Sequence, residues 1–234
     1  MKAKAIVIKG NDVSEQGFAR LVKTNKLVEN PFEITRFDAI VPEQADELME
    51  IYKLKWSWVW SGVRFDEKSG IRMHAYGGKN PKRRIACFLS HFLLWEETAT
   101  LGEPILILEH DSEFIRRFDP TEVINSDYGA IGINDPRGAT RRANVFHDIV
   151  QKSKDEIVPC PIIDKMEVAQ GLAGASAYLI KQIAAQKVIK ACYDFGAMPN
   201  DAVLCQQLLP KELAVTKKYY TKVQGLLSTT TSLD

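Results

Sequence analysis

Two carboxylates and an imidazole stand side by side in this chain, at Glu109, His110 and Asp111. They follow directly on the apolar run of residues 105–108, which is typical of a strand buried on both faces of a sheet. In an open α/β sheet, ligands bind just beyond the carboxyl ends of such strands. Residues 109–111, which we call the acidic strand end, are therefore a candidate site for a divalent cation or a polar substrate.

Carboxylate oxygens are the ligands that Mg²⁺ and Mn²⁺ prefer, and these ions usually keep places for substrate phosphates. Glu109 and Asp111 offer such oxygens, and His110 would favour Mn²⁺ over Mg²⁺. A cation there would neutralise the charge of a departing diphosphate, while a separate carboxylate took the proton from an attacking hydroxyl. Asp201, which follows a proline-containing turn, is a candidate for that base, or else it only caps a short helix.

The elements that must hold this site can be predicted on both sides of it. A helix is predicted from Pro81 to Gly102, because a proline suits the first turn and a glycine the end of a helix. At the N-terminus, a strand over residues 5–8 and a helix capped by Asp12 or Ser14 indicate a βα unit. The next predicted elements are a strand over residues 34–37, a helix over 42–55, a strand over 128–133 and a helix over 181–193.

Two polar segments, residues 61–84 and 137–155, lack periodicity and are predicted as long surface loops. The first combines glycines with cations that include Lys79 and Arg84, a composition that suits the diphosphate of a nucleotide sugar. A merely solvated basic loop is the alternative. The second is expected to be a mobile loop near an acceptor.

Three tryptophans follow at a spacing of two, at Trp56, Trp58 and Trp60. They could form one face of a strand that packs on the core, or an aromatic platform for a sugar ring. The preferred interpretation is the core-facing strand, because alternating large apolar residues are the usual signature of one.

Bulk properties exclude several classes of protein. The chain has 234 residues, 45% hydrophobic and 26% charged, with a formal net charge of +1, which is ordinary for one globular α/β domain and gives no sign of nucleic-acid binding. It carries no GxGxxG or Walker loop, and its four cysteines form no CxxC pair, so free thiols are expected. No signal peptide and no apolar run of about 20 residues is present, so we expect a cytoplasmic protein. Peripheral membrane contact and the oligomeric state stay open.

Four blocks resemble glycosyltransferase family 25, which includes lipopolysaccharide and collagen galactosyltransferases. The run RIACFLSHFLLW of residues 84–95 is similar to the family's GCxLSHxxxW helix, and LILEHD of residues 106–111 to its LILEDD strand. GASAYLI of residues 174–180 resembles GTxAYLIS, and PND of residues 199–201 resembles PVD. The departures are His110, where the family has an acidic residue, and the first strand and turn, which poorly match the family's INLxxxxxR.

This resemblance implies a GT-A-like (Rossmann-like) mixed sheet flanked by helices, a nucleotide-sugar donor such as UDP-galactose, a divalent cation, and inversion at the anomeric carbon. It makes Glu109 and Asp111 the metal ligands, with Asp111 the best candidate, and Asp201 the base or an acceptor-binding carboxylate. Ser90 and His91 would either hold the acidic strand end or contact the donor. The residues expected at the donor site are Lys9, Asn11, Lys79, Arg84, Ser90, His91, Glu109, His110 and Asp111.

The function predicted from these observations is a cytoplasmic hexosyltransferase of lipopolysaccharide biosynthesis, formed by a single domain over residues 1–234. It would move a hexose, galactose before others, from the nucleotide diphosphate to a glycan hydroxyl. The alternative is a non-catalytic nucleotide- or sugar-binding module on the same scaffold, which the change at His110 motivates. A glycoside hydrolase with paired carboxylates has no specific support in the motifs.

Overall fold

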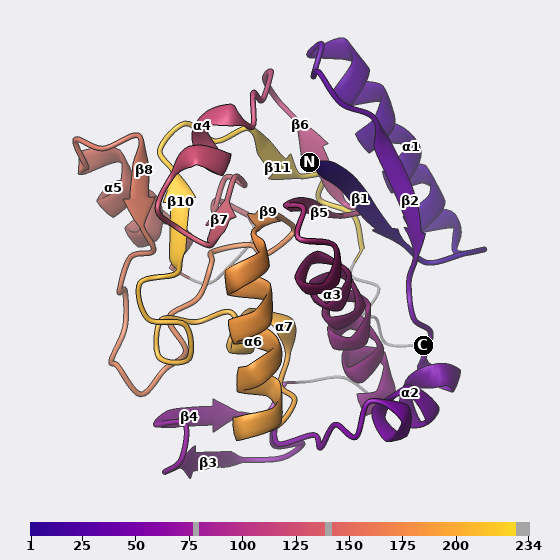
Figure 1. The fold of residues 1–234 in the computed structure, drawn as a ribbon, viewed down its shortest axis with the longest axis vertical. Helices are drawn as coiled ribbons and strands as arrows, with labels where there is room; N and C mark the ends of the chain where they lie inside the picture. Colours follow the sequence, from indigo (N-terminus) through magenta and orange to yellow (C-terminus); the bar gives the residue numbers. More distant parts are fainter. Residues whose placement is uncertain (77–79, 139–141, 228–234) are drawn as a thin grey trace.

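The computed structural model describes residues 1–76, 80–138 and 142–227, and its centre is one mixed sheet of seven strands (Figure 1). β9 runs antiparallel to both of its neighbours and β8 is an antiparallel edge strand, while the other strands run parallel. In sheet order the strands are β2 (Ile34–Asp38), β1 (Lys2–Val7), β5 (Ile105–Glu109), β9 (Ala177–Ile180), β7 (Ala130–Gly132), β10 (Leu213–Thr216) and β8 (Ile157–Pro159). The expected α/β class with a mixed sheet is confirmed.

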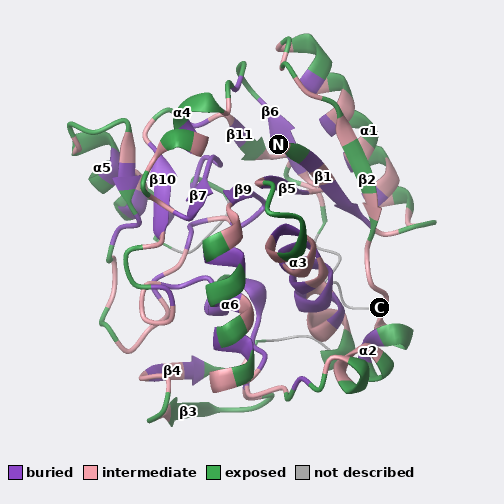
Figure 2. Cartoon of the chain, viewed as in Figure 1, coloured by how far each residue is buried: buried purple, intermediate pink, exposed green. Residues whose placement is uncertain are grey.

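Helices cover both faces of this sheet. One face packs against α3 (Pro81–Leu101), α5 (Ala143–Lys152), α6 (Gln182–Phe195) and α7 (Asn200–Val203), and the other against α1 (Asp12–Leu27) and α4 (Thr121–Asn125). In β5 the side chains of Ile105 and Ile107 join the first core, and those of Leu106 and Leu108 join the second. The central strands are accordingly buried throughout, as Figure 2 shows for β5, β9 and β10 and as the apolar run of β5 predicted.

The helix that precedes the acidic strand end begins and ends as its sequence predicts. The Asn80 side chain accepts a hydrogen bond from the backbone of Lys82, Pro81 occupies the first turn, and Gly102 ends α3 with φ +74°. A residue with a Cβ would be strained at that left-handed position, which is why glycine stands there. The next strand, β5, therefore starts only a few residues after α3, and the two elements act as one unit.

Two small sheets and a short α2 complete the architecture. β3 (Val63–Asp66) and β4 (Ile71–His74) form a hairpin, and β6 (Ser112–Phe114) pairs with β11 (Thr221–Val223). The helix predicted over residues 42–55 is a 3₁₀ turn at Pro42–Gln44 followed by α2 (Ala45–Ile51). α1 is capped by Asn11, whose side chain accepts from the Ser14 amide, rather than by Asp12 or Ser14.

Both predicted long loops are wrong. Residues 61–84 contain the β3–β4 hairpin and the first turn of α3, and Ile71 and Met73 of the hairpin point into the core at the strand period of two. Residues 137–155 contain α5, which buries Phe146 and Val150 on one face. In each segment a few apolar residues at the right spacing suffice to anchor the element, although the overall composition is polar.

The strand predicted over the tryptophan segment is wrong, but Trp58 lies in the core and Trp56 packs against it, as the core-facing interpretation expects. Trp56 makes only an isolated bridge to Ala197, Trp58 is buried, and Trp60 is 45% exposed. The rings of Trp56 and Trp60 stack at 5.2 Å between centroids instead of lying side by side on one sheet face.

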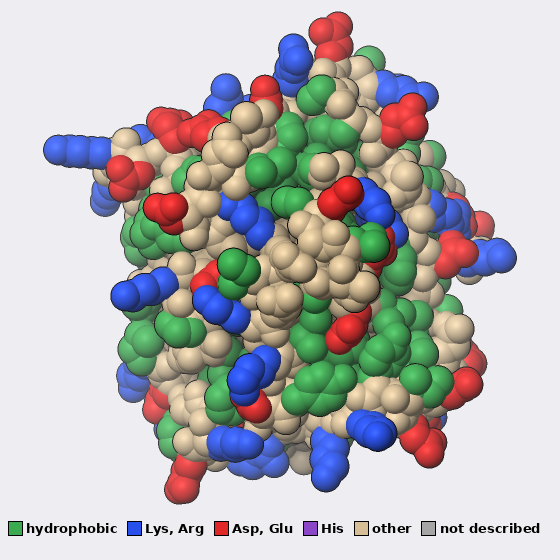
Figure 3. All heavy atoms as spheres, viewed as in Figure 1, with side chains coloured by type: hydrophobic (Ala, Val, Ile, Leu, Met, Phe, Trp, Pro, Cys, Tyr) green, Lys and Arg blue, Asp and Glu red, His purple; other side chains and the backbone are tan. Residues whose placement is uncertain are grey.

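The described residues show no disulfide bond. All four cysteines are free, as expected. No described helix has both the length and the apolar character that crossing a membrane requires. Cationic and anionic side chains are interspersed with apolar ones on the face that Figure 3 shows.

Candidate active site at the acidic strand end

Three elements bring the predicted site residues together. β5 ends in Glu109, α3 runs alongside it, and α7 lies against α3. Parallel pairing places Ile6 of β1 opposite Glu109, so the turn that follows β1 opens at the same edge of the sheet. This edge is the carboxyl end of the parallel strands, where ligands bind in open α/β folds.

Glu109 is held by a buried histidine. His91, only 1% exposed, places Nε2 3.1 Å from Glu109 Oε1 and Nδ1 2.9 Å from the hydroxyl of Tyr178, which also accepts a 2.8 Å bond from Trp95 Nε1. The buried Tyr178 hydrogen needs an acceptor, which assigns it to Nδ1 and leaves Nε2–H to donate to Glu109. Burial raises the pKa of Glu109, but the hydrogen bond from His91 and the electrostatic effects of His91 and His110 together outweigh it, so the net pKa lies below the usual range. Glu109 is therefore ionised.

Asp111 is the opposite case. Its Oδ1 is buried and has no hydrogen-bond partner among the described residues. Burial, together with the negative charge of Glu109, raises the pKa of Asp111 to about 7. Two neighbouring carboxylates cannot both be ionised at low cost. Asp111 can therefore carry its negative charge only if a positive partner is present.

These two carboxylates fit a divalent cation. A hard cation beside Asp111 Oδ1 would supply its missing partner and offset the repulsion from Glu109. Cys87, His91 and Glu109 also offer ligand atoms within 4.8 Å of one another. That second group is already committed otherwise: both nitrogens of His91 are hydrogen-bonded, and burial with the charges of Glu109 and Asp201 raises the pKa of the Cys87 thiol and keeps it protonated.

Asp201 lies in the same neighbourhood, at the start of α7. The hydroxyl of Tyr76 lies 3.4 Å from each of its carboxylate oxygens, and the guanidinium of Arg84 lies 4.0 Å from the centroid of the Tyr76 ring. The preceding residue, Asn200, accepts a 3.7 Å bond from Cys87 of α3. Asp201 is exposed, but the protein atoms around its carboxylate displace water from it and so raise its pKa. The positive charge of Arg84 lowers that pKa, and the negative charge of Glu109 raises it. The net shift is upward.

The other predicted residues have different surroundings. Ser90 is buried in α3, where it donates to Ala86 O and accepts from the amide of Ile40. Burial lowers the pKa of His110 despite the opposing effect of Glu109, so its ring is neutral at pH 7. Lys9 is exposed in the turn after β1. Lys79 lies outside the described residues.

Asn11, Gly17 and Gln224 belong to the segments on the α1 side of the acidic strand end. Asn11 uses its side-chain oxygen to cap α1. Gln224 donates from its amide nitrogen to the carbonyls of Gly17, His110 and Ser112, and its own backbone N–H donates to Asp111 O at 2.7 Å. Gly17 of α1 packs so closely that a Cβ there would lie 2.7 Å from the carbonyl oxygen of His110.

Comparisons with known proteins agree with this geometry at the level of the family. The family model described as glycosyltransferase family 25 (LPS biosynthesis protein) matches residues 19–204, well over half of the chain. The chain belongs to glycosyltransferase family 25. It is therefore a hexosyltransferase-type enzyme that uses a nucleotide-sugar donor and a glycan acceptor, and its mixed sheet flanked by helices fits the expected GT-A-like architecture.

Solved structures resemble the chain more loosely. An active-site mutant of LgtC has a TM-score of 0.42 and 12% identity, covering 92% of this chain and 72% of that one. Mouse xyloside xylosyltransferase 1 in its apo form gives 0.43 and 8%, covering 92% and 84%. A Bacillus anthracis protein described as a putative glucose-1-phosphate thymidylyltransferase has a TM-score of 0.40 and 12% identity, covering 92% of this chain and 86% of that one. No curated protein matches the chain.

Several residues around the site escaped sequence reasoning. Tyr76, Tyr178 and Gln224 bond predicted site residues directly, and Trp95 packs on His91 and bonds Tyr178. Of these four, Trp95 and Tyr178 stand in blocks that resemble the family, whereas Tyr76 and Gln224 do not. Tyr76 follows a hairpin that was read as loop, and Gln224 reaches the site across more than a hundred residues of sequence. Contacts of that kind leave no periodic signal in the chain.

Proposed function

We propose that the chain, as one domain over residues 1–234, transfers galactose from UDP-galactose to a hydroxyl of a lipopolysaccharide glycan in the cytoplasm, with inversion. The orphaned, buried oxygen of Asp111 beside the ionised Glu109 carries this proposal. Glu109 and Asp111 would hold Mn²⁺ or Mg²⁺. When bound, the cation would stabilise the negative charge of the nucleotide diphosphate.

Asp201 is the proposed base. Its raised pKa suits the task, since a general base works best with a pKa close to the operating pH. Tyr76 holds both carboxylate oxygens and thereby orients them, while Arg84, fixed against the Tyr76 ring, keeps a positive charge near them. The deprotonated acceptor would attack the anomeric carbon from the face opposite the nucleotide.

Ser90 and His91 act as positioning residues in this proposal. Both are buried and fully engaged with protein groups, which favours the structural alternative over direct contact with the donor. Lys9 and Asn11, in the turn after β1, stay candidates for the nucleotide because their turn opens at the same sheet edge.

The test is the Asp201→Asn variant, with Asp155→Asn as a matched control on an exposed carboxylate of a distant loop. Asp201→Asn should lower kcat by a factor of roughly 10²–10⁴, the usual contribution of general base catalysis, while nucleotide binding persists. Sugar transfer is measured as nucleotide release with acceptor present, and proton NMR of the product reports inversion. Equal turnover in both variants would remove Asp201 from the role of base. Nucleotide binding with no transfer by the unaltered protein would instead favour the non-catalytic module.

A further inference from the structure

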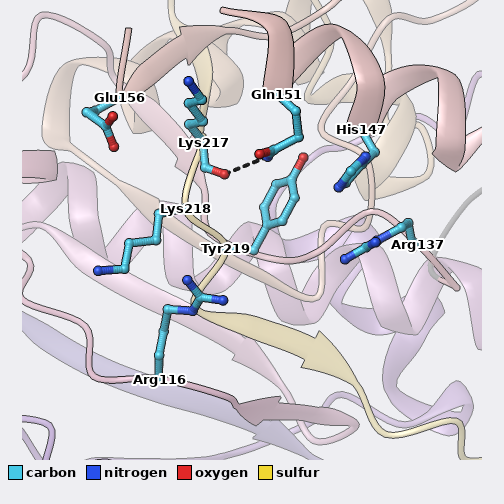
Figure 4. A pocket seen from close by; sticks show the side chains of 8 residues that line it. All are labelled: Arg116, Arg137, His147, Gln151, Glu156, Lys217, Lys218 and Tyr219. Carbon is cyan, nitrogen blue, oxygen red and sulfur yellow. Dashed lines mark hydrogen bonds between the residues drawn. The ribbon is translucent and has the colours of Figure 1, made fainter. Parts of the chain in front are cut away.

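A second polar site lies away from Asp201 and Glu109. It is a pocket of about 330 Å³ between α5, the segment after β10 and the segment after β6 (Figure 4). Its cationic lining residues are Arg116, Arg137, Lys217 and Lys218. Nothing in the proposed transfer reaction uses this pocket.

The clearest sign that the pocket takes a ligand is the hydroxyl of Tyr219. The side chain is only 5% exposed, and its oxygen faces the side-chain amide of Gln151 without the geometry of a regular hydrogen bond to any described residue. The neighbouring Gln151 spends its amide on the carbonyl of Lys217. A buried hydroxyl without a regular hydrogen bond is destabilising, so a ligand that accepts its hydrogen would be favoured. His147 lies against the Tyr219 ring, with 5.7 Å between ring centroids.

The charge of the pocket specifies what that ligand is. Arg137 is paired with Asp135, and Lys217 Nζ donates to Ser153 O. Arg116 and Lys218 are exposed and make no ion pair with any carboxylate of the described residues, whereas Glu156 is the one acidic residue that lines the pocket. Figure 4 shows the guanidinium groups of Arg116 and Arg137 on either side of Tyr219. Free cations beside a hydroxyl donor are suited to a phosphate or carboxylate.

The pocket and the acidic strand end lie along the same edge of the sheet. β10 is parallel to β7, and β7 and β5 are both antiparallel to β9, so the ends of β10 and β5 point the same way. Three strand spacings separate them, which amounts to roughly 14 Å. Residues 217–224 run from the pocket to Asp111. Along this path the backbone N–H of Tyr220 donates to Ile133 O, and that of Gln224 donates to Asp111 O. This separation exceeds one sugar ring but is within reach of an oligosaccharide.

We propose that this basic pocket binds an anionic group, a phosphate or a carboxylate, carried by the acceptor glycan some sugar units away from the hydroxyl that is attacked. The proposal rests on the proposed transfer to a glycan. Arg116 and Lys218 would neutralise the anion and Tyr219 would donate a hydrogen bond to it. The pocket would thereby select acceptors by charge and set the distance between that charge and the reacting hydroxyl.

The first experiment measures anion binding without any sugar. Thermal unfolding is followed against inorganic phosphate, and separately against acetate, at constant ionic strength. One or both anions should raise Tm by binding the native state, and the more effective of the two identifies the preferred group. Arg116→Gln and Tyr219→Phe should lose most of that rise, whereas Lys23→Gln, which removes an exposed charge on α1, should keep it.

Tyr219→Phe also guards against a loss of folding. Because it keeps the ring and removes only a hydroxyl that makes no regular hydrogen bond, its Tm without anion should stay close to that of the unaltered protein. Equal anion-induced rises in all four proteins, or no rise in any, would overturn the anion site.

The second experiment tests the link to the acceptor. Transfer to a phosphorylated lipopolysaccharide core oligosaccharide is compared with transfer to the same oligosaccharide after phosphatase treatment. Arg116→Gln should raise the acceptor KM about tenfold for the phosphorylated form and far less for the treated form, since a lost charge-assisted bond is worth about that factor. Equal effects on both acceptors would overturn the acceptor role. If the unaltered protein transfers no sugar to either, the proposed function fails, while the phosphate titration still decides whether the pocket binds anions.

Discussion

At the scale of single residues, the site is a pair of carboxylates in contrasting states. His91 supplies a hydrogen bond that keeps Glu109 ionised, whereas Asp111 has a buried oxygen with no partner and a pKa near 7. The same protein environment therefore stabilises one negative charge and destabilises the other. The proposed cation would reverse the second effect, so Asp111 would link proton binding, cation binding and stability.

This linkage predicts how stability varies with pH in the absence of cations. The folded pKa of Asp111 lies above the unfolded value of 3.8, so the folded state holds a proton that the unfolded state releases between pH 4 and pH 7. The contribution of Asp111 is complete below pH 4 and is lost as the pH rises through about 7. Asp111→Asn should remove that decline and raise the stability at pH 8 by roughly 1–3 kcal/mol.

The measurement is thermal unfolding in EDTA at several pH values, repeated with MnCl₂. Mn²⁺ should raise Tm of the unaltered protein and do so more at pH 8 than at pH 5, because protons compete for Asp111. Asp111→Asn should respond little. An identical pH slope in Asp111→Asn and in the control Asp155→Asn would contradict the buried, destabilised carboxylate.

Residue types near the site could be read from the sequence, but their partners could not. Glu109, His110 and Asp111 can be recognised in the sequence because they follow directly on an apolar strand. Asp201 can be recognised because it starts a helix after a turn. The hydroxyl of Tyr178 between Trp95 and His91 depends on two elements that pack in space. Nothing in the local sequence of either element specifies that contact.

At the scale of elements, α3 positions most of the site. Arg84, Cys87 and His91 follow one another at helical spacing on the same face, which points toward the acidic strand end and α7. α1 approaches from the other face of the sheet, and Gly17 allows it to touch the backbone of His110. The acidic strand end therefore lies between α1 and α3. Gly17 allows the close approach of α1, and the buried His91 holds α3 to Glu109.

Gly17→Ala tests this close packing. Alanine is intrinsically about 1 kcal/mol better than glycine inside a helix, so on propensity alone the change should stabilise α1. The new Cβ, however, would lie 2.7 Å from the His110 carbonyl oxygen and 2.9 Å from Leu226, and one of these atoms is backbone. We expect a net loss of about 1–3 kcal/mol from overpacking and a weaker Mn²⁺-induced rise in Tm.

Gln16→Ala, one position earlier and exposed on the same helix, serves as the control and should change Tm little. If Gly17→Ala proved as stable as Gln16→Ala, the close approach of α1 to the strand end would be refuted.

Elements with clear end signals were predictable, and elements anchored by a few side chains were not. α3 was predicted over its full length because Pro81 and Gly102 mark its ends, and β5 because its four apolar residues are consecutive. The β3–β4 hairpin and α5 lie in polar segments whose described residues are anchored by a few buried side chains, chiefly Ile71, Met73, Phe146 and Val150. Tertiary packing, not local pattern, decides such segments.

At the scale of the whole molecule, Gln224 connects three parts of the fold. Its side-chain amide donates to carbonyls of α1, of the acidic strand end and of β6, and its backbone N–H bonds Asp111. Beside it, β11 pairs with β6. This arrangement lets the segment that leaves the basic pocket also close the proposed cation site.

Gln224→Leu should accordingly destabilise the protein by about 1–3 kcal/mol, because buried carbonyls lose their donor. The Mn²⁺-induced rise in Tm should also shrink, since the backbone around Asp111 is no longer held. Denaturant unfolding and the Mn²⁺ titration measure the two effects, with Gln186→Leu on an exposed position of α6 as the comparison. Loss of stability with an undiminished Mn²⁺ response would show that Gln224 supports the fold but not the site.

The bonds of Gln224 also fix the order in which the site can mature. The residue stands 114 positions after His110, so these bonds cannot form until the intervening chain has been made and the sheet has closed around it. Contacts of such long sequence separation form late in folding, and during synthesis the earlier parts of a chain emerge first. A nascent chain would thus carry Glu109 and Asp111 for some time with the elements up to α3 made but without the bonds of Gln224. Full enclosure of the proposed cation site would therefore follow the synthesis of Gln224, well after its carboxylates have been made.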